Sequence, residues 1–350
     1  MSKRCGVVCP IASGGGITEA FLTSLDMIAD QGETPVAIVP EGFRFLDRLT
    51  AKGYETHKIK NLERGGAFNL LVHAFAIASA AWKARVDVLV LNNGRFVRGV
   101  KLLAPSIPLV AIYHGGKLSR YLKADRIITI NDDQLQYLHD AGYPREKCTV
   151  VDNALPLMNL PAYVPRSFEA NKAVIGTLRL LEHAKGVDIL IDAIGILAAR
   201  GKRFRTRIGS SGTQEAALKE QARALGISDL VEFCGWIDDK AAFFDSLDIY
   251  VLPSRAEEWG IGIVEANAGR LPVIATACLG PKRIVRDGVT GVIVPIADPT
   301  AMAAAIEKLA SDPERAETLA QNAYAHCEAN YLFPKIAPLF VREVLRVLER

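Results

Sequence analysis

Residues 248–275 read DIYVLPSRAEEWGIGIVEANAGRLPVIA and contain three elements with different hydrophobic patterns. The apolar runs at 248–252 and 272–275 predict two buried strands, and the segment 261–270 between them predicts a helix. Two strands joined by a helical crossover run in the same direction. This stretch therefore predicts a parallel sheet whose faces are covered by helices.

The same alternation of short apolar runs and longer amphipathic segments continues on both sides of this stretch. The other predicted strands are 5–10, 35–39, 87–91, 108–113, 126–130, 148–151, 173–177, 205–209, 230–234 and 291–294. The other predicted helices are 17–31, 43–52, 67–84, 133–142, 185–200, 213–225, 239–246, 281–286, 299–310 and 312–330. A segment with three prolines at 153–167 predicts a linker between the two halves. The pattern indicates two doubly wound α/β domains.

The composition agrees with this architecture and excludes several other classes. A chain of 350 residues is long enough for two domains of about 100–200 residues each. Half of the residues are apolar, which excludes a disordered chain, and a net charge of +3 does not indicate a nucleic-acid partner. The six cysteines form no CxxC pair, so we expect neither a disulfide framework nor a zinc site. No apolar run is long enough to predict a transmembrane helix.

A glycine-rich segment, Ser13-Gly14-Gly15-Gly16, follows the first predicted strand and precedes a predicted helix. Glycines allow the backbone to approach a ligand, and the N–H groups of a helix N-terminus attract anions, so we expect a phosphate site here. The segment does not match a dinucleotide fingerprint, because the third glycine would fall at Glu19, where a carboxylate prevents close helix–strand packing. A tight turn without a ligand is the alternative.

Two cations, Arg179 and Lys185, follow the predicted strand at 173–177. In doubly wound sheets, ligands bind beyond the carboxyl ends of the strands. The planar fork of arginine and the compact charge of lysine both match phosphate oxygens. The pair predicts a phosphate site, with ordinary surface cations as the alternative.

Two carboxylates lie around the start of the helix in the opening stretch. Glu257 precedes this helix, and Glu265 lies about one turn inside it. Carboxylates accept hydrogen bonds from adjacent hydroxyls, as in a sugar ring or a ribose. The N–H groups at Gly260 and Ile261 can hold a diphosphate. Acids placed near a helix N-terminus to interact with the helix dipole are the alternative.

Together these motifs resemble the retaining GT-B glycosyltransferases of family 4, the glycosyl transferases group 1. The segments that carry the resemblance are Glu257–Glu265 with its continuation to Val273, DGVTGVIVP at 287–295, Arg179–Gly186, residues 210–239, and residues 124–154. The resemblance is weakest over 40–105, which leaves the acceptor undefined. It implies a GT-B fold, in which two Rossmann-like domains face a central cleft. The implied parts are an acceptor-binding domain at 1–160, a nucleotide-sugar-binding domain at 161–332, and a C-terminal helix at 333–350 that returns to the first domain.

The resemblance also implies roles for individual residues. Glu257 matches the glutamate that contacts the donor sugar, Glu265 the one that binds the ribose, and His114 a histidine lining the donor-sugar site. The implied catalytic residues are Glu257, His114, Arg179 and Lys185. The implied donor-binding residues are Gly15, Gly16, Arg179, Lys185, Trp236, Ile237, Glu257, Gly260, Ile261 and Glu265. Neither a metal nor a cofactor is implied, so Asp132-Asp133 and Asp238-Asp239 are interpreted as helix caps.

The implied reaction moves a sugar from a nucleotide diphosphate sugar to an acceptor hydroxyl with retention of the anomeric configuration, as in a hexosyltransferase. Uridine and guanine donors use the same contacts, and we favour a UDP-sugar. The expected acceptor is a cell-surface glycan or a lipid-linked sugar, as in lipopolysaccharide or polysaccharide biosynthesis. The alternatives are another GT-B nucleotide-sugar enzyme (an epimerase or an inverting transferase) and a non-catalytic subunit that binds a nucleotide sugar. The failed dinucleotide fingerprint disfavours an NAD oxidoreductase.

A basic stretch at 44–64 suggests where a membrane could bind. Its cations are Arg44, Arg48, Lys52, Lys58, Lys60 and Arg64, and they lie among Phe43, Phe45, Leu46 and Leu49. The expected location is cytoplasmic, with peripheral contact at the inner face of the cell membrane through this stretch. A solvated helix face is the alternative.

Overall fold

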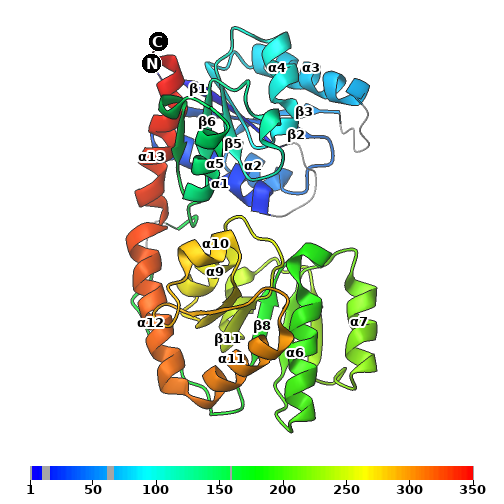
Figure 1. The fold of residues 1–350 in the computed structure, drawn as a ribbon. Helices are drawn as coiled ribbons and strands as arrows, with labels where there is room; N and C mark the ends of the chain where they lie inside the picture. Colours follow the sequence, from blue (N-terminus) through cyan, green and yellow to red (C-terminus); the bar gives the residue numbers. More distant parts are fainter. Residues whose placement is uncertain (1, 10–15, 61–66, 158–159, 350) are drawn as a thin grey trace. The chain divides into compact units, whose positions relative to one another are not determined.

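The computed structural model describes residues 2–9, 16–60, 67–157 and 160–349, and the chain divides into two compact units. The first unit is Met1–Met158 with Leu332–Arg350, and the second is Asn159–Tyr331. Each unit is built on one parallel sheet, of seven strands in the first and six in the second (Figure 1).

The sheet of the first unit has the strand order β3-β2-β1-β4-β5-β6-β7. Its strands are β1 (Arg4–Val8), β2 (Thr34–Pro40), β3 (Glu55–Ile59), β4 (Val88–Leu91), β5 (Leu109–Tyr113), β6 (Arg126–Thr129) and β7 (Cys148–Val150). From β1 the sheet grows outward to β2 and β3, and the chain then returns to place β4 on the other side of β1. The order therefore reverses between β1 and β4, and ligands of doubly wound folds bind at such a switch point.

Helices cover both faces of this sheet. They are α1 (Gly16–Asp30), α2 (Leu46–Ala51), α3 (Ala67–Lys83), α4 (Val97–Leu103), α5 (Asp132–Asp140) and the C-terminal α13 (Phe333–Leu345). Helices α3 and α4 bury Ile77, Val97 and Val100 in the same core as Leu89 of β4 and Leu109 of β5. Helices α1 and α13 pack against each other. The C-terminal segment thus belongs to the first unit, although the whole second unit precedes it in the chain.

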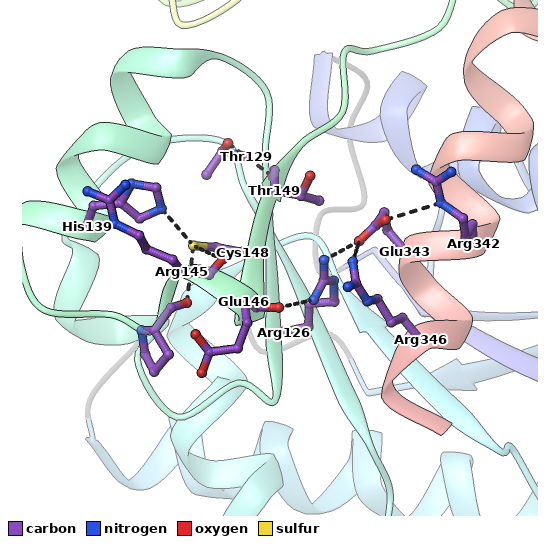
Figure 2. A network of polar contacts seen from close by, with 11 residues as sticks. Arg126, Thr129, His139, Arg145, Glu146, Cys148, Thr149, Arg342, Glu343 and Arg346 are labelled. Carbon is purple, nitrogen blue, oxygen red and sulfur yellow. Dashed lines mark hydrogen bonds and ion pairs between the residues drawn. The ribbon is translucent and has the colours of Figure 1, made fainter. Parts of the chain in front are cut away.

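A buried ion pair fixes α13 to the sheet of the first unit. Glu343 of α13 accepts a hydrogen bond from Arg126 of β6, and the two side chains are 4% and 5% exposed. Arg126 also donates from Nη1 to the backbone oxygen of Glu146 at 2.7 Å. Arg342 and Arg346 flank Glu343 on the solvent side (Figure 2). Because buried charges are tolerated only when they are paired, this contact specifies where the helix docks.

The sheet of the second unit has the strand order β10-β9-β8-β11-β12-β13. Its strands are β8 (Ile175–Leu178), β9 (Thr206–Gly209), β10 (Val231–Gly235), β11 (Ile249–Leu252), β12 (Val273–Thr276) and β13 (Val292–Val294). The chain builds outward from β8 to β10 and then returns to place β11 on the other side of β8. The switch point of this unit therefore lies between the carboxyl ends of β8 and β11.

Alternate residues of β11 face different helices of the second unit. Its helices are α6 (Val187–Ala199), α7 (Glu215–Ala224), α8 (Lys240–Asp245), α9 (Ile261–Ala268), α10 (Leu279–Ile284), α11 (Pro299–Ser311) and α12 (Pro313–Asn330). Ile249 and Val251 share a core with Ile194 of α6 and Ile306 of α11. Tyr250 points the other way, toward α8 and α9. Both faces of the sheet are therefore buried, which explains the unbroken apolar runs of the strands.

Each predicted strand overlaps an observed one, and the sequence analysis missed strand β3 and helix α4. Strand β3 lies at the sheet edge and is partly exposed, with only Ile59 buried, so it has no apolar run to reveal it. Helix α4 has seven residues, too few for a clear period. The predicted helix 43–52 is shorter in the structure and covers Leu46–Ala51. The cap of α5 is Asn131 and not Asp132-Asp133, whereas Asp239 caps α8 as expected.

Candidate active site

Backbone contacts join the two loops at the switch point of the second unit. The loop after β8 leads through a 3-10 turn at His183–Lys185 into α6, and the loop after β11 leads into α9. Arg255 donates its backbone N–H to the carbonyl oxygen of Ala184 at 2.9 Å. At Gly186, φ is +66° and a Cβ atom would lie 2.1 Å from the carbonyl oxygen of Pro253, so only glycine allows this approach. The side chains of the two loops are therefore held at fixed positions relative to one another.

These loops bring together three of the residues expected at the site. Arg179 donates from Nη2 to Oε2 of Glu257, and Lys185 donates from Nζ to the same oxygen at 3.1 Å. The side chains are 7%, 13% and 28% exposed for Arg179, Glu257 and Lys185, respectively. We call these three residues the switch-point cluster. It carries one net positive charge beside the carboxyl ends of β8 and β11, where an anionic ligand would be attracted.

Electrostatics favour the charged forms of Glu257 and Arg179. Burial alone would raise the pKa of Glu257, but Arg179 and Lys185 outweigh it and lower this pKa below its ordinary value. Burial likewise opposes the charge of Arg179, but Glu257 and the Tyr250 hydroxyl raise the pKa of its guanidinium. Glu257 and Arg179 therefore act as fixed charges at neutral pH.

The sequence analysis missed Tyr250, which lies beneath the cluster. It is fully buried in β11, and burial raises the pKa of its hydroxyl. A Cβ atom on Gly262 of α9 would lie 2.4 Å from this hydroxyl, so the helix start packs directly on the tyrosine. The signal in the sequence was a single tyrosine within an otherwise aliphatic strand, DIYVL. Its hydroxyl is the polar group that this strand places beside Arg179.

Helix α9 begins where the sequence predicted. Gly260 is its N-cap with φ at +102°, Ile261 is its first residue, and no side chain caps the helix within the described part of the chain. The first N–H groups of a helix lack partners inside the helix and carry partial positive charge. A Cβ atom on Gly260 would lie 3.8 Å from Cγ of Glu257, so the helix start adjoins the switch-point cluster. Backbone donors and side-chain cations thus lie at the same edge of the sheet.

Glu265 contacts a different cation. Its Oε1 accepts a hydrogen bond from Lys240 at 2.7 Å, and its side chain is 15% exposed. Asp239 caps the helix that carries this lysine by accepting from the N–H of Ala242 at 3.0 Å. The sequence analysis did not identify Lys240, because nothing in a helix pattern shows which neighbouring element a lysine reaches. The ion pair holds one carboxylate oxygen of Glu265 in a defined position.

Trp236 and Ile237 follow β10 at the same carboxyl edge, two strands away from β8. Both side chains are partly buried, and Trp236 donates from Nε1 to Asp238 at 3.0 Å. A Cβ atom on Gly209 would lie 2.9 Å from Cγ1 of Ile237, so this side chain packs over the end of β9. The structure places both residues at the edge of the sheet that holds the cluster.

The remaining expected residues lie in the first unit. His114 follows β5, and its Nε2 lies 3.1 Å from Oδ1 of Asn92, which follows β4. Asn92 donates from Nδ2 to the carbonyl oxygen of Val8 at the end of β1, so its Oδ1 is the acceptor and Nε2 of His114 carries the proton. Asn92 was missed from the sequence, although its place directly after a buried strand was a signal. Gly16 is the first residue of α1, and Gly15 lies outside the described residues.

We expect His114 to remain neutral throughout the physiological pH range. Burial lowers the pKa of its imidazole from 6.5 to about 4. The associated stability is fully present above pH 6.5 and is lost as the pH falls through about 4, because the unfolded chain takes up a proton first. In a pH titration followed by NMR, the His114 ring resonance should not move between pH 8 and 5.5. A midpoint near 6.5 would show that the ring is solvated and would contradict the observed burial.

No group of three or more His, Cys, Asp or Glu side chains in the described ranges could hold a metal ion. None of the helices in those ranges is both long enough and apolar enough to cross a bilayer.

Comparisons with known proteins match the second unit to a family of glycosyltransferases. Residues 165–326 match the model of the glycosyl transferases group 1. Over 328 residues the chain is 26% identical to the lipopolysaccharide core biosynthesis glycosyltransferase LpsE of Rhizobium meliloti (strain 1021), covering 89% of this chain and 90% of LpsE. A shorter match, 35% identical over 151 residues, is to the alpha-D-kanosaminyltransferase of Streptomyces kanamyceticus. It covers 42% of this chain and 39% of that protein, so the alignment spans less than half of this relative.

The solved structures agree on the fold. Anabaena HepE, crystallised in complex with UDP and glucose, has a TM-score of 0.81 at 19% identity over 97% of this chain and 98% of HepE. A glycosyltransferase from Rickettsia africae ESF-5 has a TM-score of 0.81 at 18% identity over 100% and 99% of the two chains. The family match over residues 165–326 and the shared architecture lead to one conclusion: the chain is a glycosyltransferase with the GT-B fold, and its second unit is similar to the glycosyl transferases group 1.

Proposed function

We propose that this glycosyltransferase moves a sugar from a nucleotide diphosphate sugar to an acceptor hydroxyl with retention of the anomeric configuration and without a metal ion. In this reaction the bond between C1 of the sugar and the β-phosphate oxygen breaks, and its electron pair stays on the diphosphate. A new bond forms between C1 and the acceptor oxygen. The acceptor proton passes to the departing phosphate oxygen, so that charges and atoms balance.

The switch-point cluster is the observation that carries this proposal. Arg179 and Lys185 converge on one point beside the N-terminus of α9. Negative charge grows on the leaving diphosphate in the transition state, and preorganised cations and N–H groups lower the free energy of that state. Two fixed cations supply the charge that a divalent metal supplies in other phosphate chemistry. The proposal therefore predicts turnover in the presence of EDTA.

The position of Glu257 supports retention without a covalent enzyme intermediate. Arg179 and Lys185 both donate hydrogen bonds to the same oxygen of Glu257. The lowered pKa of the Glu257 carboxyl makes this carboxylate a weak nucleophile. We therefore propose that Glu257 orients the donor sugar by accepting hydrogen bonds from the hydroxyls of the sugar. Retention then follows from attack on the same face that the diphosphate leaves. His114, neutral and with its proton on Nε2, has a lone pair on Nδ1 and is suited to accept a hydrogen bond from a sugar hydroxyl.

The relatives support a donor class and an acceptor class. HepE binds UDP and glucose, which favours a UDP-sugar as the donor for this chain. LpsE, aligned over nearly its whole length, takes part in lipopolysaccharide core biosynthesis. We therefore propose that the acceptor is a cell-surface glycan or a lipid-linked sugar, and that the enzyme works at the cytoplasmic side of the membrane.

The stereochemical proposal can be tested with a donor labelled with ¹³C at C1 of the sugar. UDP-glucose and its GDP counterpart are each offered with membrane glycolipids and EDTA, and the one-bond carbon–hydrogen coupling of the product identifies the new linkage. We expect an α linkage from the α-configured donor. A β linkage would indicate an inverting enzyme. Release of a free epimerised sugar would indicate an epimerase. Donor binding without any turnover would indicate a non-catalytic subunit.

We predict that Glu265→Ala weakens donor binding through the ribose. Each hydrogen bond from a ribose hydroxyl to the carboxylate contributes about 1.5–3 kcal/mol, so UDP affinity should fall about 10–100-fold. Calorimetric titration with UDP and with 2′-deoxy-UDP isolates this contact. The wild type should prefer UDP, and the variant should bind the two nucleotides equally.

Glu220→Ala, which changes a largely exposed acid of the same unit, is the matched control and should retain the preference. If Glu265→Ala still discriminated against the deoxynucleotide, Glu265 would not be the ribose ligand.

A further inference from the structure

We infer that helices α3 and α4 form a docking surface for an anionic lipid bilayer. The surface consists of exposed apolar side chains, Leu71, Phe75, Trp82 and Leu102, together with exposed cations, Lys83 and Arg98. We call these six residues the α3–α4 surface. The inference concerns the first unit and does not depend on the donor site proposed above.

The apolar side chains share one side of α3. Leu71, Phe75 and Trp82 are 50%, 58% and 49% exposed and lie four and seven residues apart, which places them in one stripe along the helix. The opposite side, which includes Ile77 and Ala81, is buried in the core. Helix α3 therefore has an apolar side toward the sheet and a second apolar stripe toward solvent. A stripe of large exposed apolar residues on a soluble unit marks an interaction site.

Helix α4 extends this stripe. The two helices lie side by side (Figure 1), and a Cβ atom on Gly99 would lie 2.6 Å from Cβ of Ala74, so they touch closely. Leu102 is 73% exposed and Arg98, one turn earlier, is also exposed. Helical geometry places these two residues on the outer side of α4, next to the stripe of α3. Two adjacent helices thus present one continuous amphipathic face.

Charge complementarity identifies the partner. Residues 65–124 contain eight Lys or Arg residues and a single acid, Asp87, which gives a net charge of +7. Lys83 and Arg98 are exposed and make no ion pair within the described part of the chain. The α3–α4 surface itself carries two cations and no acid, so two copies of it would repel each other, whereas each cation is attracted to an anionic membrane surface. Aromatic side chains such as Trp82 and Phe75 suit the boundary between headgroups and acyl chains.

The basic stretch at 44–64 is a poorer candidate. Phe43 and Leu49 are buried and therefore cannot enter a bilayer. Lys52 pairs with Asp26 at 2.6 Å, and Arg48 lies 3.9 Å from Glu19. The membrane contact that the sequence suggested there is better carried by the α3–α4 surface.

Vesicle flotation of the full chain tests the inference. Vesicles of phosphatidylcholine with an equal part of phosphatidylglycerol are compared with vesicles of phosphatidylcholine alone. We expect the wild type to bind the anionic vesicles. In Phe75→Ser/Trp82→Ser the affinity for these vesicles should fall about tenfold, which corresponds to 1.4 kcal/mol of binding free energy. Lys83→Glu/Arg98→Glu should lose binding to the anionic vesicles in the same way. The matched control, Arg44→Glu/Arg48→Glu, should bind within about twofold of the wild type.

Tryptophan fluorescence gives an independent measurement. Vesicles should shift the emission to shorter wavelength in the wild type, and Trp82→Phe should remove the shift, because Trp259 is buried and Trp236 belongs to the second unit. Unchanged binding in Phe75→Ser/Trp82→Ser, or loss of binding only in the Arg44/Arg48 variant, would overturn the inference. So would a wild-type dimer that the Phe75/Trp82 variant dissociates, since the stripe would then bind a second copy. UDP titration of each variant shows separately whether the donor site is intact.

Discussion

Lys185→Ala should lower the turnover number about 100–1,000-fold while leaving the melting temperature unchanged. Lys185 donates to Glu257 at 3.1 Å and is 28% exposed, so its removal leaves no deeply buried charge unpaired. In the proposed reaction its ammonium stabilises the diphosphate most strongly in the transition state, where that group gains negative charge. Loss of one such preorganised contact typically costs about 100–1,000-fold in rate. Steady-state kinetics with saturating UDP-sugar measure the effect.

Two further variants show whether the effect depends on the charge at position 185. Lys172→Ala removes an exposed lysine of the same unit, paired with Glu169, and should retain wild-type turnover. Lys185→Arg keeps the charge and should recover part of the rate. If Lys185→Ala retained turnover within threefold of the wild type, the switch-point cluster would not hold the leaving group.

Glu343→Ala should destabilise the first unit by about 3–5 kcal/mol. The substitution leaves Arg126 buried and without its carboxylate partner, and an uncompensated buried charge carries a penalty of this size. Folded domains are stable by only about 5–15 kcal/mol, so a large share of the stability would be lost. Urea unfolding followed by hydrogen exchange in the peptides of β6 and α13 separates this effect from the unfolding of the second unit.

A double substitution distinguishes the ion pair from simple packing. Arg126→Met/Glu343→Leu replaces both charges with apolar groups and should recover most of the lost stability. Arg342→Ala, which removes a largely exposed cation beside Glu343, should change the stability by less than about 1 kcal/mol. A double variant as unstable as Glu343→Ala would contradict this account of how α13 is held.

The sequence predicted the sheets because most of their strands are buried on both faces. Such strands appear as apolar runs in the sequence, and the exposed edge strand β3, which lacks such a run, was missed. The order of the strands, and with it the two switch points, could not be derived from periodicity. The resemblance to a known family supplied the GT-B architecture, and the comparisons confirmed it.

The candidate site was predictable where residues follow strands and start helices. Arg179, Glu257 and Gly260 were found because each occupies such a position, and the structure joins the first two directly. Tyr250 and Lys240 were missed for a different reason. Their roles depend on which neighbouring element their side chains reach, and one-dimensional spacing does not contain that information.

Hydrogen exchange of the full chain with and without UDP, in EDTA, tests the central claim most directly. The claim is that the switch point of the second unit holds a nucleoside diphosphate without metal. We predict that UDP slows hydrogen exchange in the peptides that cover 179–186 and 257–265. An enzyme with a guanine donor would show the same protection with GDP. Protection by NAD at the start of α1 alone, or no protection at the switch point by any nucleoside diphosphate, would contradict the account.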